Sequence, residues 1–219
     1  QMKNIGGGIW EIHTEFDLSL EGNCYKYRIY NEENSISVSD SFARYSQWGS
    51  HDSSIVYTEN YEWGDGEWMS SKEKSTSVPI NIYQLHLGSW KTRAGRHYSE
   101  GDAYLNYTDV AAELAGYASD MGYTHVCFID ITEGGSNNAF SPTARYGKPD
   151  GLKLIVDILH RNNIGTIFEW NADIDLSDGS SETKNAFLTS NAYLSIVVSV
   201  LGKVPVVKLE QFSKTPSPK

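Results

Sequence analysis

The stretch INIYQLHLGSW at residues 80–90 decides the fold of this chain. It opens with a strand-length run rich in β-branched and aromatic residues, which is typical of a buried strand. A helix-length segment at 106–121 follows, in which apolar residues recur every three or four positions. A second apolar run, HVCFIDI at 125–131, comes directly after that segment. This order of strand, helix and strand predicts a parallel sheet covered by helices.

The predicted helix in this unit has a recognisable start and end. Its apolar face comprises Val110, Leu114, Tyr117 and Met121. Asn106 or Thr108 can cap the first turn, because their side-chain oxygens accept hydrogen bonds from unpaired backbone amides. Gly122 follows the last apolar position and predicts the end of the helix.

The same unit repeats further along the chain. A second amphipathic helix follows Pro149, and its apolar face comprises Leu152, Ile155, Val156 and Leu159. The run IGTIFEW at 164–170 is the third predicted strand, a third helix is predicted at 182–201, and a fourth strand is predicted at 204–209. Four such strands predict an α/β fold that is about half of a TIM-type β/α barrel, since a full barrel has eight.

The amino-terminal part has a different periodicity. Short apolar runs with a period of two lie at 9–13, 24–30, 36–38 and 55–57, with polar turns between them. This alternation predicts antiparallel strands of a small sandwich, and the polar, glycine- and serine-rich stretch that follows predicts a linker. The expected organisation is an antiparallel β domain at 1–62, a linker at 63–78, a half barrel at 79–210 and a disordered tail at 211–219.

The composition argues against several classes of function. The formal net charge of −10 comes from scattered carboxylates, which argues against binding nucleic acid or anionic lipid. No apolar run approaches the ~20 residues that are needed to span a membrane. Cys24 and Cys127 lie far apart and are expected to be free thiols, and the first residues have no apolar run typical of a signal peptide. We therefore expect a cytoplasmic location.

No cofactor and no metal are expected. His86 and His125 are on different predicted strands, with no cysteine and no carboxylate close by, which favours structural histidines over metal ligands. Asp173, Asp175 and Asp178 are close together in the chain. They lack the spacing and the terminal glutamate of a calcium loop, so a solvated turn is the favoured interpretation.

Five motifs occur in a fixed order along the chain. They are NIYQLHLGSW at 81–90, MGYTH at 121–125, PTARYG at 142–147, IGTIFEW at 164–170 and KNAFLTSNA at 184–192. In this order they resemble the barrel strands and helices of the bacterial glycogen (1,4-α-glucan) branching enzymes, which are members of the α-amylase superfamily. The amino-terminal strands resemble part of the immunoglobulin-like, carbohydrate-binding domain that precedes that barrel.

The resemblance implies a specific reaction. Branching enzymes transfer an α-1,4-glucan segment to a 6-hydroxyl, which forms an α-1,6 branch through a covalent glycosyl-enzyme intermediate. This chemistry needs one carboxylate as nucleophile and a second as acid and base, about 5 Å apart. In the family an arginine beside the nucleophile and a histidine after the third strand complete the site, on loops at the carboxyl ends of the strands.

This chain departs from the family at catalytic positions. Alignment of the third strand places Glu169 and Trp170 at an Asp-Trp pair and Ile174 at the histidine. Alignment of the fourth strand places Pro205 at the arginine and Val207 at the nucleophilic aspartate. A valine cannot attack and a proline carries no cation, so the covalent route is predicted to be lost. No catalytic residue is predicted in this chain.

Three hypotheses for function follow. The first is a non-catalytic, branching-enzyme-like protein that acts by assembly, as a homo-oligomer or with a protein partner that covers the open half barrel. The second adds binding of α-glucan. The candidate substrate-binding residues are Glu169, Trp170, Trp48, Trp63 and Trp68. Packing inside the fold is the favoured alternative for the tryptophan rings. The third hypothesis is enzymatic: the chain is a fragment or subunit of a 1,4-α-glucan branching enzyme.

Overall fold

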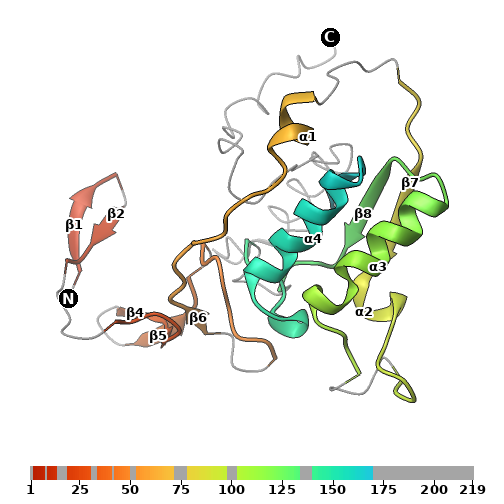
Figure 1. The fold of residues 1–219 in the computed structure, drawn as a ribbon. Coiled ribbons are helices and arrows are strands. Elements are labelled where there is room, and N and C mark those ends of the chain that lie inside the picture. The colour runs from red at the N-terminus through yellow and green to blue at the C-terminus, as the bar shows by residue number, and fades with distance from the viewer. Residues whose placement is uncertain are drawn as a thin grey trace, which may run out of the picture.

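A parallel three-stranded sheet lies at the centre of the computed structural model (Figure 1). Its strands are β7 (Ile82–His86), β8 (His125–Ile129) and β9 (Gly165–Phe168), in that spatial order. Ile82 pairs with His125, and His125 pairs with Gly165, so the three strands begin at the same level. The predicted α/β fold and the parallel direction are confirmed for these strands.

The structure describes residues 2–7, 9–13, 19–30, 34–40, 42–49, 53–71, 78–97, 103–133 and 140–169. The predicted helix at 182–201, the predicted strand at 204–209 and the predicted tail at 211–219 lie outside these residues. The described part therefore contains three strands and two helices of the predicted half barrel. No helix in this part is long and apolar enough to cross a membrane.

Helices α3 (Tyr107–Asp120) and α4 (Pro149–Arg161) pack against each other and the sheet (Figure 1). Helix α3 begins after Asn106, one of the two predicted caps, whose backbone amide donates to the Asp109 carboxylate at 3.3 Å. Gly122 follows the helix with a φ of 74°, a left-handed conformation that glycine adopts without a Cβ clash. The predicted start and end of this helix are confirmed.

The buried face of α3 differs in part from the predicted face. Val110 and Leu114 are buried as predicted. Tyr117 and Met121 were expected beside them and are exposed instead. The remaining buried apolar positions in the middle of the helix are Ala111, Ala115 and Ala118. Small side chains let α3 lie close to its neighbours, and this close packing leaves Tyr117 at the rim of the interface.

Helix α4 is buried on two sides. The predicted apolar face is confirmed, because all four of its residues are at most 1% exposed: Leu152, Ile155, Val156 and Leu159. Lys153, Asp157 and His160 are polar residues of the same helix, and they are buried as well. Buried polar groups need partners. The amino-terminal part of the chain supplies at least one partner for each of these three residues.

Asp157 joins α4 to the amino-terminal segment. Its carboxylate accepts hydrogen bonds from the Tyr61 hydroxyl and from the Gly64 backbone amide, both at 3.0 Å. Arg161, one turn further along α4, donates to the same carboxylate at 2.7 Å. Burial, together with the bond to Asp157, raises the pKa of the Tyr61 hydroxyl, so this phenol keeps its proton and donates it.

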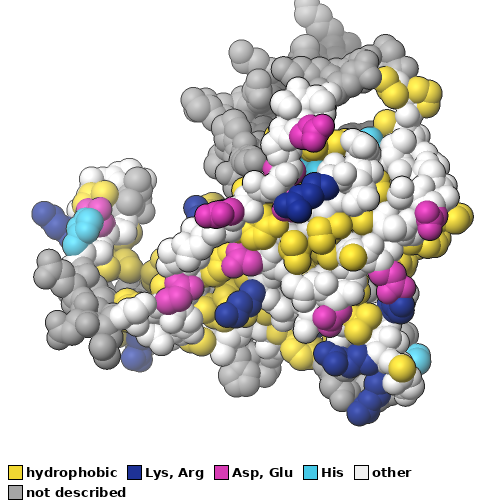
Figure 2. Space-filling view, viewed as in Figure 1, with side chains coloured by type: hydrophobic (Ala, Val, Ile, Leu, Met, Phe, Trp, Pro, Cys, Tyr) yellow, Lys and Arg dark blue, Asp and Glu magenta, His cyan; other side chains and the backbone are white. Residues whose placement is uncertain are grey.

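Lys153 makes the second connection to the amino-terminal segment. Its ammonium donates to the Tyr57 hydroxyl at 3.0 Å and to the Asp150 carboxylate at 3.3 Å. It also lies 3.3 Å from a Glu59 carboxylate oxygen. These three partners satisfy the three donors of a buried ammonium. Figure 2 shows acidic and basic side chains close together along the segment that runs beside α4.

Helix α1 (Gly66–Ser71) lies in the stretch that was predicted to be a linker. Trp68 of this helix stacks on the His160 imidazole, with ring centroids 5.1 Å apart. His160 Nδ1 in turn lies 2.9 Å from Asp65 Oδ2, and both residues are 1% exposed. Residues 63–71 are therefore packed on α4 and are not a free connection.

The described amino-terminal strands form three separate antiparallel pairs. These pairs are β1 (Lys3–Gly6) with β2 (Ile9–Glu11), β3 (Cys24–Tyr25) with β6 (Ser54–Ile55), and β4 (Tyr27–Tyr30) with β5 (Ser35–Val38). The prediction of a sandwich is wrong for these residues. Strands this short offer few inward positions, and apolar side chains such as Trp10 and Ile36 remain 58% exposed.

The close approach of α3 and α4 at Gly151 generates a prediction about stability. A Cβ at Gly151 would lie 2.8 Å from the Tyr107 Cβ, and Tyr107 is 1% exposed and cannot move aside. Gly151→Ala should lower the free energy of unfolding by about 1–3 kcal/mol, although alanine is the better helix former. Gly116→Ala in α3 is the matched control, because no atom lies within 4 Å of its new Cβ. The control should raise stability by up to about 1 kcal/mol. Similar urea midpoints for the two variants would contradict the prediction.

The contact between Asp65 and His160 generates a second prediction. Asp65→Ala leaves the buried His160 without the acceptor at Nδ1, and should lower the free energy of unfolding by about 1–3 kcal/mol. Glu67→Ala, on the exposed side of the same segment, is the control and should change it by less than about 0.5 kcal/mol. Near-ultraviolet circular dichroism, which reports the packing of Trp68, provides the second readout. An unchanged Trp68 signal and unchanged stability in Asp65→Ala would refute the prediction that the Asp65–His160 contact holds α1 on α4.

Candidate functional site

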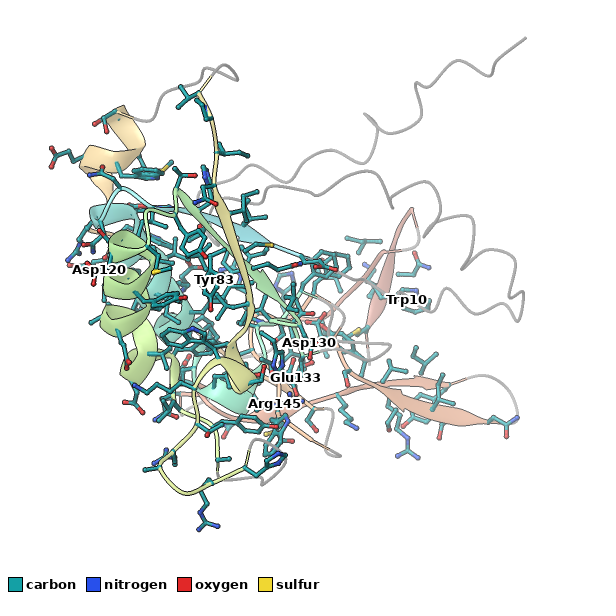
Figure 3. All side chains as sticks on the ribbon, turned by 90° about the vertical axis from the view of Figure 1, so that its right-hand side faces the viewer. Trp10, Tyr83, Asp120, Asp130, Glu133 and Arg145 are labelled. Carbon is teal, nitrogen blue, oxygen red and sulfur yellow. The ribbon has the colours of Figure 1, made fainter. Side chains whose placement is uncertain are left out.

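The carboxyl ends of the three parallel strands meet at one edge of the sheet. His86 ends β7, Asp130 follows β8 and Glu169 follows β9. Figure 3 shows Asp130, Glu133 and Arg145 gathered near the end of β7 and β8. Loops at the carboxyl ends of parallel strands are where β/α barrels build their binding and catalytic sites. This edge is therefore the candidate functional site.

His86 connects three chain segments at this edge. Its Nδ1 accepts a hydrogen bond from the Ser89 backbone amide at 3.2 Å, at the start of helix α2 (Leu87–Trp90). An Nδ1 that accepts carries no proton, so the proton of the neutral imidazole lies on Nε2. Nε2 lies 3.4 Å from the Tyr146 hydroxyl and 3.6 Å from Asp130 Oδ2. The expectation that His86 has no carboxylate close by is therefore wrong.

The backbone at Asp130 has an uncommon conformation. Its φ is 52°, in the left-handed region that non-glycine residues seldom adopt. Asp and Asn tolerate this region better than other residues, and such positions occur often at functional sites. The turn brings the Asp130 carboxylate toward His86. Among the described residues, no three His, Cys, Asp or Glu side chains are grouped as metal ligands would be.

Glu133 ties two loops of the site together. Its carboxylate accepts a hydrogen bond from the Ala144 backbone amide at 2.7 Å, and it interacts with the Gly49 backbone and the Thr143 side chain. Gly49 is next to Trp48, so this one carboxylate holds the Trp48 loop against the turn at 143–144. Burial raises the pKa of Glu133 in spite of these hydrogen bonds, which favour the charged form. Sequence reasoning missed this role, because the partners lie 11 and 84 positions away.

Arg145 is surrounded by aromatic rings. Its guanidinium carbon lies 5.8 Å from the ring centroid of Trp48, 5.4 Å from that of Tyr104 and 6.0 Å from that of Tyr146. These distances are those of cation–π contacts. The Arg145 Nε is buried and has no hydrogen-bond partner among the described residues. Tyr146 lies beneath this cluster, 1% exposed and edge-on to both Tyr104 and Tyr107.

The three described tryptophans that were predicted to bind substrate differ in their surroundings. Trp48 is 43% exposed. Trp63 packs against the core and edge-on to Tyr61, and Trp68 stacks on His160. Trp63 and Trp68 are therefore packing rings that hold the amino-terminal segment on the sheet unit. Trp48 is the one of the three that lies at the carboxyl edge with an accessible ring.

The remaining predicted site residues are described only in part. Glu169 is exposed and accepts a hydrogen bond from the Gln84 amide at 3.3 Å. Four further positions lie outside the described residues: Trp170, Ile174, Pro205 and Val207. The loss of the catalytic side chains at these positions therefore stays a prediction. Within the described part, Asp130 and Glu169 are exposed carboxylates at the strand ends, whereas Glu133 is occupied by backbone amides.

The raised pKa of Glu133 generates a prediction about pH. A carboxyl whose folded pKa lies above its unfolded value makes stability fall as the pH rises between the two values, because the folded state then binds more protons. The free energy of unfolding of the unmodified chain minus that of Glu133→Gln should thus be largest below about pH 4. It should decrease as the pH rises from the ordinary value of a carboxyl to the raised pKa of Glu133, and it should level off above that pKa. Urea unfolding at a series of pH values measures this difference, and an increase with pH would contradict the assignment.

The sequence is similar to that of 1,4-α-glucan branching enzymes from several bacteria. It is 38% identical to the enzyme of Aquifex aeolicus over 175 residues, which is 75% of this chain and 27% of that protein. It is 37% identical to the enzyme of Fusobacterium nucleatum over 173 residues, which is 74% of this chain and 27% of that protein. It is 33% identical to the enzyme of Chlamydia trachomatis serovar L2 over 172 residues, which is 74% of this chain and 22% of that protein. The chain spans about a quarter of the length of these curated relatives. No family model matches it.

The fold is similar to that of two solved pullulanases and of a protein titled putative alpha amylase. Pullulanase from Bacillus acidopullulyticus superposes with a TM-score of 0.58 at 15% identity, over 84% of this chain and 26% of that chain. Pullulanase type I from Bacillus subtilis, complexed with maltose, gives 0.57 at 17% identity, over 84% of this chain and 30% of that chain. A protein titled putative alpha amylase, from Salmonella typhimurium, gives 0.52 at 16% identity, over 76% of this chain and 26% of that chain. Identity this low speaks for the fold alone.

The sequence similarity and the structural similarity involve the same part of the chain. The motifs at 81–90 and 142–147 lie on strand β7 and at the turn that carries Arg145, which are the parts that build the carboxyl edge. The sequence matches and the shared fold extend over about three quarters of the chain. This chain is a relative of the 1,4-α-glucan branching enzymes, of which it spans about a quarter of the length.

Proposed function

We propose that this chain provides the first strands and helices of a branching-enzyme barrel, and that it binds the α-1,4-glucan on which such a barrel acts. The single observation that carries the proposal is the identity of 33–38% to branching enzymes over about three quarters of the chain. The matched region includes the strand ends that form the candidate site. A protein that keeps this edge keeps surfaces suited to the substrate of its relatives.

Transfer of a glucan segment requires more than the described residues. A retaining mechanism needs two carboxylates about 5 Å apart on either side of the scissile bond. Glu133 is held by backbone amides and is not available as a nucleophile. The predicted nucleophile position is Val207, and the positions of the second carboxylate fall later in the family sequence. Branching activity is therefore proposed to require further barrel strands that carry both carboxylates.

The alternative of a non-catalytic protein that acts only by assembly stays a prediction. Its support is the sheet itself, in which β7 is an edge strand among the described residues. An edge strand can pair with another chain. The sequence comparisons favour a chain that is part of a branching enzyme over one that acts only by assembly, because the relatives are named as branching enzymes.

The proposal predicts glucan binding without transfer. The purified chain should migrate more slowly in a native gel that contains amylopectin than in a gel without it, relative to a protein that does not bind glucan. The same preparation should leave the iodine absorbance of amylose unchanged, because the predicted nucleophile position holds Val207 instead of a carboxylate.

Each assay has an outcome that would overturn its part of the proposal. Equal migration with and without amylopectin would refute binding of glucan. A decrease in iodine absorbance, together with new α-1,6 linkages detected by a debranching enzyme, would show that the chain carries its own nucleophile.

A further inference from the structure

Trp48, Tyr104 and Tyr146 form a cluster of aromatic rings around the Arg145 guanidinium. Three of these side chains are at least partly accessible, and only Tyr146 is fully buried. Here the Trp48 ring is 43% exposed, although it faces Tyr104 edge-on at 6.4 Å and lies near the Arg145 guanidinium.

The exposed Trp48 ring is held by a fixed backbone. The neighbouring Gln47 amide donates to the Ser53 carbonyl at 2.8 Å, and Ser46 is fully buried. On the other side, the Gly49 backbone interacts with the half-buried Glu133 carboxylate. The exposed ring is therefore positioned from both flanks. A preorganised surface binds a ligand at a lower entropic cost than a mobile one.

The groups at this cluster are complementary to a neutral, hydroxyl-rich ligand. The Trp48 and Tyr104 rings provide flat apolar faces, on which the flat faces of a sugar ring can stack. The Arg145 guanidinium provides hydrogen-bond donors, and the exposed Asp130 carboxylate provides acceptors. The net charge of these groups with Glu133 is negative, which disfavours phosphate or another anion.

We infer that Trp48, Tyr104 and Arg145 form a glucose-binding subsite for α-1,4-glucan at the carboxyl edge of the sheet. The inference rests on the proposed function and assigns it to particular residues. Trp48 stacks on the sugar face, and the partly accessible Arg145 guanidinium donates to its hydroxyl groups. Glu133 is a positioning residue, since it holds the Trp48 loop and the turn that carries Arg145.

The experiment compares Trp48→Ala with Trp10→Ala in amylopectin affinity electrophoresis. Trp10 is the matched control, because its ring is also more than 40% exposed and lies on the β1–β2 pair, away from the sheet edge (Figure 3). Trp48→Ala should weaken binding by about tenfold, and Trp10→Ala should leave it unchanged. Thermal unfolding of each variant reports whether the fold is intact.

A third variant keeps the test decisive if Trp48→Ala unfolds. Trp48→Phe retains an aromatic ring in the cluster but removes the indole, so the fold should persist. Titration with maltoheptaose should change the tryptophan fluorescence of the unmodified chain, and this change should be lost in Trp48→Phe. A fluorescence change of the same size in Trp48→Phe would overturn the inference.

The outcomes separate the inference from the proposed function. If the unmodified chain is retarded by amylopectin and Trp48→Ala is retarded equally, the subsite is refuted while glucan binding by the chain stands. If the unmodified chain is not retarded, glucan binding itself is refuted, and the subsite with it. Retardation that is lost in Trp48→Ala and kept in Trp10→Ala supports both.

Discussion

The burial of α4 on both of its sides is the constraint on which the rest of the structure depends. One side packs against α3 and the sheet through apolar side chains, as in any β/α unit. The other side places Asp157 and His160 under the amino-terminal segment. A buried polar group lowers the stability of the fold unless it has a hydrogen-bond partner. Detachment of the segment would therefore leave Asp157 and His160 without these partners, which costs free energy. The contacts of Tyr61, Gly64 and Asp65 therefore fix where the amino-terminal part joins the sheet unit.

This junction also determines the geometry of the candidate site. The segment that runs beside α4 begins after β6, and the loop before β6 carries Trp48. Once Tyr57 and Tyr61 are bonded to α4, the Trp48 loop has little freedom, and Glu133 anchors its end to the turn after β8. An amino-terminal segment that contributes nothing to the parallel sheet thus supplies one ring of its carboxyl edge. The contacts that stabilise the amino-terminal segment on α4 therefore also position Trp48 at the candidate site.

Local periodicity predicted the part of the fold that depends on local patterns. The strands β7, β8 and β9 and the apolar face of α4 follow from runs of neighbouring residues, and Asn106 and Gly122 follow from the rules of helix ends. Periodicity predicted burial of Tyr117 wrongly, because which face of a helix is buried also depends on the size of the side chains on that face. The buried face of α3 contains alanines, which periodicity of large apolar residues does not single out. Periodicity also failed for the amino-terminal strands, whose alternation is real but whose pairs are too short to form a second layer.

The site was less predictable than the fold for a related reason. The composition indicated tryptophan as a candidate sugar-binding residue, but Trp48, Trp63 and Trp68 have the same side chain. Only their neighbours in the fold decide which ring is accessible and which ring packs inside. Those neighbours are long-range: Trp68 meets His160 and Trp48 meets Tyr104 and Arg145. The structural role of Glu133 was hidden in the same way, since a carboxylate after a strand is equally compatible with catalysis, binding or a loop anchor.

Binding and chemistry come from different strands in a barrel of this kind, and this separation lets one persist without the other. The residues that could contact a glucan here follow β7 and β8 or precede the sheet, whereas the predicted nucleophile position belongs to the predicted strand at 204–209. The predicted loss of the nucleophile at Val207 would remove a bond-forming step and leave the surface at the other strand ends intact. Because that surface is built on the same contacts that hold α4, selection for a stable fold alone would preserve much of it. Contact with a glucan is the role that we propose for the exposed Trp48 ring, which lies beside Tyr104 and Arg145.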